Sequence, residues 1–136
     1  METDKTLIKP LAIRNLGEFF RTHDIKYVAE DAIFKNMTTG EETKGRQAIS
    51  EMLHYIYHVA FDAEAVVTNT VITDKNALLE ANFVGKHISE FAGIPATNKQ
   101  VNFPLCVTYD LNKDGLIQNA RVYMQTDVMM QQLKSE

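Results

Sequence analysis

The sequence predicts an α+β fold, in which helices come first and pack on one face of an antiparallel sheet. Two observations carry this prediction. Residues 101–111 alternate between apolar and polar side chains, as in a half-buried strand, and a turn sequence follows at 112–115. Upstream, apolar side chains recur at the spacing of a helix. The length of 136 residues suits a single domain over residues 1–136.

Most of the helix is expected in the first half of the chain. Residues 5–23 and 45–60 have apolar side chains at helical spacing, and a short helix is expected over 25–30. His54 and His58 lie opposite the apolar stripe of the third helix. They have the i, i+4 spacing of a zinc site, but no third ligand accompanies them. We therefore expect both side chains to face solvent and to bind no metal.

The strands are expected mainly in the second half. Their predicted ranges are 32–38, 65–73, 77–88, 101–111 and 116–126, with a brief final helix over 129–134. Pro104 lies inside the fourth of these strands and cannot donate a hydrogen bond to a neighbour. It therefore predicts an edge position or a bulge at that point.

Composition excludes several classes of protein. The net charge is −4, with acids and bases interspersed, so no basic stripe points to a nucleic-acid partner. No apolar run approaches the roughly 20 residues of a membrane span, and the polar start of the chain is unlike a signal peptide. Cys106 is the only cysteine, which excludes an intramolecular disulfide. A cytoplasmic location is the default expectation.

Several polar side chains are candidates for a site. His87 ends an apolar strand face, where an imidazole could donate to a carbonyl or exchange a proton, or merely bond the following loop. Asp127 follows an apolar-rich strand and could act as an acid or base if desolvated. Its spacing favours instead a cap on the last helix. In a strict strand Gln125 and Tyr123 share the face of Asp127, which is a recognition surface only if that face borders a pocket.

The last third of the chain carries a family resemblance. Its matching stretches are Gly85-Lys86-His87, residues 93–101 (Gly-Ile-Pro-Ala-Thr-Asn-Lys-Gln-Val), Asp114-Gly115-Leu116-Ile117, Tyr123 and Gln132-Leu133, with a looser match at Gly45-Arg46-Gln47-Ala48-Ile49. In this order they resemble the SnoaL-like polyketide (ester) cyclases of the nuclear transport factor 2-like group. The resemblance implies a cone-shaped, strongly bent sheet that encloses a pocket with the N-terminal helices, and a homodimer through the exposed sheet face.

The resemblance also implies a reaction and a set of site residues. The family closes a ring by an intramolecular aldol reaction without a cofactor, in which a carboxylate removes a proton alpha to a carbonyl. Gln125 occupies the position of that carboxylate, and an amide cannot exchange protons at ordinary pH. Asp127 is then the nearby candidate base, and His87 a second catalytic residue. The candidate substrate-binding residues are Gln125, Tyr123, Asn36, Phe83 and Phe103, although core packing or a strand end also explains the last three.

Two functions remain open on the sequence. The first is a cyclase-type enzyme that acts on a small, largely apolar carbonyl compound. The second is a non-catalytic binding module of the same fold, because Gln125 replaces the usual Asp. A different pocket enzyme, such as an isomerase or epoxide hydrolase, would be favoured by two or more converging carboxylates. No phosphate loop, dinucleotide fingerprint or nucleophile elbow is present, so we expect no cofactor.

Overall fold

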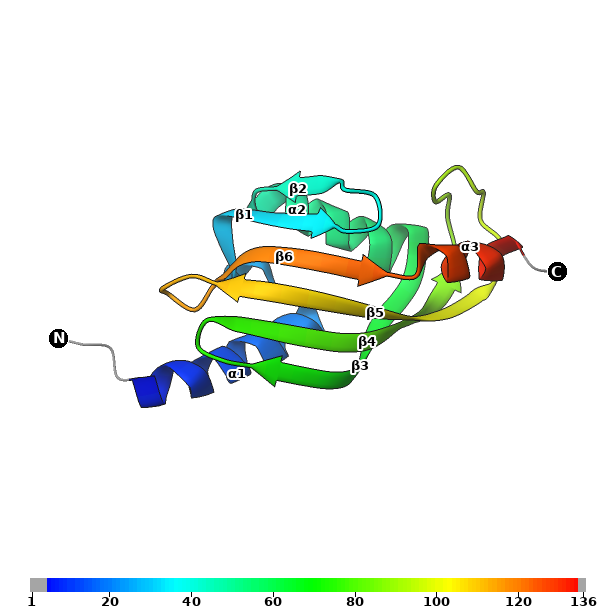
Figure 1. Ribbon diagram of the computed structural model, residues 1–136. Coiled ribbons are helices and arrows are strands. Elements are labelled where there is room, and N and C mark those ends of the chain that lie inside the picture. Colours follow the sequence, from blue (N-terminus) through cyan, green and yellow to red (C-terminus); the bar gives the residue numbers. More distant parts are fainter. Residues whose placement is uncertain (1–4, 135–136) are drawn as a thin grey trace.

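The computed structural model describes residues 5–134 and has the predicted α+β architecture (Figure 1). Its elements are α1 (Lys5–Thr22), the 3₁₀ turn η1 (Ile25–Tyr27), β1 (Val28–Asn36), β2 (Glu42–Lys44), α2 (Arg46–His54), the π-helical turn η2 (Tyr55–Ala60), β3 (Phe61–Ile72), β4 (Asn76–His87), β5 (Gln100–Leu111), β6 (Ile117–Met124) and α3 (Thr126–Lys134).

One curled, unclosed sheet forms the body of the molecule. Its strand order is β2-β1-β6-β5-β4-β3. Every neighbouring pair is antiparallel except β1 and β6, which run parallel, so the expectation of a wholly antiparallel sheet was wrong for this pair. Figure 1 shows α1 and α2 on the same side of the sheet and α3 at one end of it. We call the face toward α1 and α2 the concave face, and the opposite one the convex face.

The predicted boundaries fail mainly around β1 and β2. The helix expected over 25–30 is the short turn η1, which Asp24 caps by accepting a hydrogen bond from the backbone N–H of Lys26. Val28 and Ala29 are buried, and Val28 already pairs with Ile117 of β6. Burial in the sheet therefore outweighs helix propensity there. The three-residue strand β2 is too short for periodicity to reveal.

Gly85 marks a close approach between β3 and β4. It pairs with Ala63, and a Cβ atom built on Gly85 would lie 2.4 Å from the Cβ of Ala63 and 2.5 Å from the carbonyl oxygen of Asp62. No side chain fits at such distances without movement of the backbone. Glycine is therefore required where these two strands come together.

Pro104 lies at a local edge, although β5 is an inner strand of the sheet. The pairing between β5 and β6 begins only at Leu105. Two residues before Pro104, the backbone N–H of Asn102 donates to Oε1 of Gln132 in α3 at 2.8 Å, and Nε2 of Gln132 donates to the carbonyl of Asn102 at 2.8 Å. Alternate residues direct their backbone groups to the same side, so the nitrogen of Pro104 faces a region where β6 has ended. This confirms the predicted edge position locally.

The core lies between the concave face and the helices. Its largest fully buried side chains include four phenylalanines, Phe19 of α1 and Phe61, Phe83 and Phe103 of the sheet. Within residues 5–134, no helix is both long and apolar enough to cross a membrane.

A candidate ligand cavity

A cavity of about 90 Å³ lies inside the core, where α1, α2 and η2 face the sheet. Its wall is mostly apolar, and its polar side chains are His23, Tyr57 and Tyr109. The full lining is Phe19, Phe20, His23, Phe34, Met52, Leu53, Ile56, Tyr57, Ala65, Leu79, Phe83, Leu105, Val107, Tyr109, Val122 and Met124. We call this space the central cavity.

Two larger pockets adjoin the central cavity. The first, of about 530 Å³, lies along β3 and shares Phe20, His23, Tyr57 and Ala65 with it. The second, of about 280 Å³, lies beside β1 and shares only apolar side chains, namely Phe34, Met52, Ile56, Val122 and Met124. We call them the β3 pocket and the β1 pocket. Because each pocket shares lining residues with the central cavity, the central cavity lies between the β3 pocket and the β1 pocket.

The two tyrosines reach the central cavity from different elements. Tyr57 lies in the π-helical turn η2, and its ring centroid is 4.6 Å from that of His23 and 5.2 Å from that of Phe83. Burial raises the pKa of Tyr57 to about 12. Tyr109 lies on the inward face of β5, against Phe20 of α1. Burial, and then the neighbouring Tyr57 and Cys106, raise the pKa of Tyr109 well above its usual value. Both hydroxyls therefore stay protonated at ordinary pH.

His23 completes the polar part of the wall directly after α1. Its backbone has a φ of 55°, and its N–H donates to the carbonyl of Phe19 at 2.7 Å, which closes the end of the helix. Burial, and then the nearby His58, lower the pKa of His23 to about 4. The imidazole is therefore neutral at ordinary pH and can both donate and accept a hydrogen bond.

The side-chain polar groups of Tyr57, Tyr109 and His23 have no hydrogen-bond partner in the described part of the chain. Among the residues whose side chains are described (12–134), no hydrogen bond is formed by the hydroxyl of Tyr57, the hydroxyl of Tyr109 or the ring of His23. Polar groups inside proteins are nearly always hydrogen-bonded, to the protein or to something bound. None of the three is among the buried atoms without a partner in the described residues, which are Nε2 of His87 and Oγ1 of Thr108, so their polar atoms are open to the cavity and make it a candidate binding site.

The predicted aromatic residues and Asn36 lie in or near these spaces. Phe83 lines the central cavity, and Phe103 stacks behind it with ring centroids 5.1 Å apart. Asn36 lines the β1 pocket, but its Oδ1 accepts hydrogen bonds from the backbone N–H groups of Thr38 and Thr39. Asn36 thus shapes the turn after β1, and its Oδ1 is already occupied by these two hydrogen bonds.

His87 is fully buried at the end of β4 and lines neither the central cavity nor the two adjoining pockets. Its Nδ1 accepts a hydrogen bond from the backbone N–H of Thr97 at 3.2 Å and lies 2.9 Å from Oγ1 of Thr97. Its Nε2 has no partner in the described part of the chain. His87 therefore bonds the loop that follows β4, which is one of the two roles expected from the sequence. Its position gives no support to a catalytic role, which stays a prediction.

Asp127, Gln125 and Tyr123 are all exposed and lie outside the central cavity. Asp127 is in the first turn of α3, where a carboxylate is favourable beside the helix N-terminus. Gln125 follows the last residue of β6, and its carbonyl accepts the backbone N–H of Met129. Tyr123 pairs with Cys106 on the convex face. The structure therefore does not bring Asp127 and His87 into one cavity.

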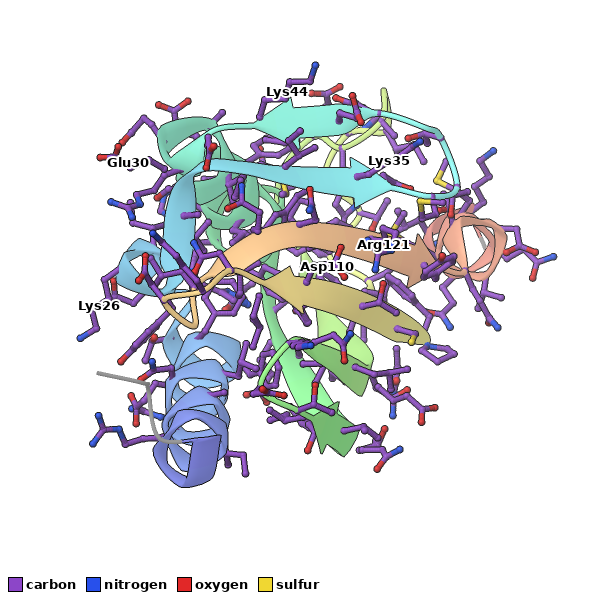
Figure 2. The ribbon with its side chains drawn as sticks, turned by 60° about the vertical axis from the view of Figure 1, so that its left-hand side comes forward. Lys26, Glu30, Lys35, Lys44, Asp110 and Arg121 are labelled. Atoms are coloured by element: carbon purple, nitrogen blue, oxygen red, sulfur yellow. The ribbon has the colours of Figure 1, made fainter. Side chains whose placement is uncertain are left out.

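The polar row of β6 continues along the same convex face. Arg121 makes a bidentate ion pair with Asp110 of β5, with nitrogen–oxygen distances of 2.8 and 3.1 Å (Figure 2). The hydrogen bond from Arg121 holds the pKa of Asp110 below its usual value. The row thus faces away from the central cavity, and its partners are on the neighbouring strand.

His54 and His58 are exposed, as predicted, with ring centroids 5.5 Å apart. The part of the chain that the structure describes contains no group of three or more potential metal-ligating side chains. The expectation that the pair binds no metal stays a prediction.

Sequence reasoning missed His23 and Tyr57 as site residues. Tyr57 has the spacing of the apolar stripe that contains Ile49 and Leu53, so it could have been read as a polar group facing the core. The left-handed conformation that turns His23 inward has no comparable signal, because a histidine after a helix is usually solvated.

A curled sheet whose concave face holds an apolar cavity under two helices defines a small-molecule pocket fold. The chain belongs to the SnoaL-like polyketide cyclase family, whose model matches residues 11–133. No curated protein sequence matches it.

Solved structures with the same fold share little sequence with the chain. A protein of Jannaschia sp. CCS1 classed as a SnoaL-like polyketide cyclase is 15% identical, with a TM-score of 0.85 and coverage of 99% of both chains. A phenazine biosynthesis-related protein of Pseudomonas aeruginosa is 17% identical, with a TM-score of 0.79 and coverage of 96% of this chain and 89% of that one. IdmH of Streptomyces antibioticus, classed as a polyketide cyclase, is 22% identical, with a TM-score of 0.72 and coverage of 92% and 97%.

Proposed function

We propose that the chain binds a small, largely apolar carbonyl compound in the central cavity. The observation that carries this proposal is the wall itself, which is apolar, internal and supplied by both the helices and the sheet. The family supports the choice of compound, because polyketides are rich in carbonyl groups. The cavity also adjoins the β3 pocket, which gives a ligand a route from the surface.

Among the residues described, no carboxylate lines the central cavity. This supports the binding module over an enzyme in which Asp127 removes a proton, since both Asp127 and Gln125 are exposed elsewhere. The absence of paired carboxylates also leaves no support for an isomerase or epoxide hydrolase of the kind that uses two acids.

Cofactor-free acid/base chemistry is the second candidate, and one observation favours it. His23 places an imidazole on the wall of the central cavity, where a ring nitrogen can accept a proton, although a pKa of about 4 makes it a weak base. A nitrogen of His23 would take the proton from the carbon alpha to a carbonyl, and the electron pair would move to the carbonyl oxygen. The enolate carbon would then attack a second carbonyl of the same molecule. The new alkoxide would recover the proton from His23.

The binding proposal is tested by filling the junction between the central cavity and the β3 pocket. Ala65 lines both spaces, whereas Val66 is on the convex face of the same strand. Ala65→Met should weaken binding of an aromatic ketone such as acetophenone, measured by calorimetry, and Val66→Met should leave it unchanged. Equal affinity of the wild type and both variants would remove the central cavity as the site.

The two catalytic hypotheses are separated by deuterium exchange. Exchange of the alpha protons of phenylacetone in D₂O, followed by NMR, reports proton removal without knowledge of the natural substrate. If His23 is the base, His23→Gln should abolish the catalysed exchange and Asp127→Asn should not change it. The opposite result would restore Asp127 as the base. No exchange above the uncatalysed rate with the wild type would leave the binding module as the function.

We also propose a homodimer that forms through the convex face, in a cytoplasmic protein. Val66, Val71 and Tyr123 of this face are 43%, 56% and 45% exposed, which is high for large apolar side chains. Val71→Glu should convert the dimer into a monomer in sedimentation analysis, whereas Ile13→Glu on α1 should not. A monomeric wild type would refute the dimer.

A further inference from the structure

We propose that the hydroxyls of Tyr57 and Tyr109 and the imidazole of His23 form one oxygen-recognition centre, which binds the oxygen of an uncharged carbonyl group of a ligand. This inference rests on the proposed function and specifies the ligand class and its orientation. Its residues differ from those that the family resemblance indicated, because none of the three lies in the matching stretches of the sequence.

The geometry gathers the three groups from separate elements. His23 follows α1, Tyr57 is in η2 and Tyr109 is on β5, yet all line the central cavity. The rings of His23 and Tyr57 are in contact at 4.6 Å between centroids, and Tyr57 and Tyr109 both line the central cavity. All three lack a protein hydrogen-bond partner within residues 12–134. Two hydroxyl donors can converge on the lone pairs of a single carbonyl oxygen.

The charge state of the wall restricts the part of the ligand inside the central cavity to neutral groups, whereas Arg21 and Glu64 line the adjoining β3 pocket. Neither Asp, Glu, Lys nor Arg lines the central cavity in the described chain, so no side chain there can pair with a charged ligand. The three polar groups are themselves neutral at ordinary pH. Moving an unpaired carboxylate into such a site is strongly unfavourable, because the charge loses its hydration without gaining a partner. A ketone, an enol or a phenol meets no such cost.

The size and connections of the cavity indicate the shape of the ligand. A cavity of about 150 Å³ holds benzene in a well-studied case, so the smaller central cavity of about 90 Å³ is expected to hold only part of a ligand. His23 and Tyr57 also line the β3 pocket, whereas the β1 pocket shares only apolar side chains. The carbonyl therefore lies at the junction with the β3 pocket. One small apolar substituent fills the central cavity, and the longer substituent extends along β3.

A matched set of ligands tests the centre on the wild-type protein. Acetophenone and α-methylstyrene have nearly the same shape, but the second has C=CH₂ in place of C=O, and benzoate adds a charge. We expect acetophenone to bind more tightly than α-methylstyrene by about 2- to 12-fold, the range of one net hydrogen bond, and benzoate to bind more weakly than either. The infrared stretch of ¹³C-labelled acetophenone should move to lower frequency than in an apolar solvent.

Matched variants assign the effect to the tyrosines. Tyr57→Phe and Tyr109→Phe should each remove most of the preference for the ketone while affinity for α-methylstyrene is kept. Tyr123→Phe, on the convex face, should preserve the preference. His23→Gln should reduce the preference as well, and thermal unfolding checks that each variant is folded.

The proposal is overturned if the wild type binds the ketone and the alkene equally and the carbonyl stretch matches that in an apolar solvent. These two readings need no variant, so misfolding of a mutant cannot obscure them. Binding of both compounds without preference would refute the oxygen centre and leave the binding function intact. If none of the ligands binds, the proposed function fails, and the oxygen centre fails with it.

Discussion

The concave and convex faces of the sheet differ in what they offer a ligand. On β6, Val122 and Met124 line the central cavity, whereas Tyr123 between them is on the convex face and 45% exposed. On the convex face Arg121 pairs with Asp110, whereas Oγ1 of Thr108 is buried without a partner in the described residues. The polar groups of the central cavity have no protein partner in the described residues. An apolar wall that holds three polar side chains around a cavity, and not a polar row along a strand, distinguishes the concave face as the candidate binding face.

The same comparison explains why Gln125, at the family's acid/base position, does not line the central cavity. Gln125 matches the family's acid/base position by sequence, but it comes after β6 has ended at Met124. Strand alternation no longer governs its direction, and the side chain is exposed. A match of sequence position therefore does not determine on which side of the sheet a side chain lies.

The two faces should differ most in how much the free energy of unfolding falls when an aromatic ring is removed. Phe103 is 1% exposed and stacks on Phe83 beneath the central cavity. Phe103→Ala should lower the free energy of unfolding by about 3–5 kcal/mol, because it leaves a void in the core. Tyr123→Ala on the convex face of the monomer should change it by about 1 kcal/mol or less. Urea unfolding measures both, and similar losses would contradict the assignment of the faces.

Addition of one methyl group should test the close approach of β3 and β4. Gly85→Ala places a Cβ within 3 Å of Ala63 and Asp62, and overpacking of this kind costs about 1–3 kcal/mol. Gly17→Ala on α1 is the matched control, since nothing lies within 4 Å of its added Cβ. That substitution should stabilise the helix by up to about 1 kcal/mol. A neutral effect of Gly85→Ala in thermal unfolding would show that the strands can separate there.

The partly buried His23 should make the free energy of unfolding depend on pH. His23 has a pKa of about 4 in the folded state against 6.5 for the unfolded chain. As the pH falls from 6.5 towards 4, the unfolded state binds a proton that the folded state does not, so stability falls. Because solvent partly reaches the ring, we expect a loss on the order of 1 kcal/mol.

The control for this pH dependence uses a variant that keeps the backbone of the native site. His23→Asn removes the titrating ring and tolerates the left-handed φ of 55°. It should flatten the dependence between pH 6.5 and 4, and the same change at the exposed His54 should not. Arg21, His58 and Glu64 share the β3 pocket with His23 and must be kept unchanged in both variants.

The smallest effect is expected for the ion pair on the convex face. Arg121 and Asp110 are 37% and 42% exposed, and pairs of this kind contribute about 0.2–1 kcal/mol. Because the folded pKa of Asp110 is lowered, the contribution is present above the usual pKa of an aspartate and is lost as the pH falls through the lowered value. A double-mutant cycle with Asp110→Asn and Arg121→Gln measures it. A coupling above about 2 kcal/mol would contradict the weak pair.

The strands and helices were predictable because their periodicity reflects burial. The alternation at 101–111 predicted β5 and placed Phe103 inward, and the turn at 112–115 separates β5 from β6 as expected. Other features depend on long-range pairing that no local pattern contains. The parallel pairing of β1 with β6, the three-residue β2 and the π-helical turn that carries Tyr57 are of this kind. Most of the predicted site residues lie outside the central cavity because they were chosen by position in the chain, while the cavity is lined by helices and strands from along the whole described chain.

The clamp between α3 and the beginning of β5 has a consequence for self-association. A strand whose backbone groups are unpaired along one side is a template on which another chain can pair. Beyond the end of β6, Pro104 has no N–H to offer, and the side chain of Gln132 already occupies both backbone groups of Asn102. One ring and one amide therefore close this stretch of edge against strand addition. Through Gln132 the C-terminal helix thus blocks strand addition at this stretch of β5, a role separate from enclosing a ligand.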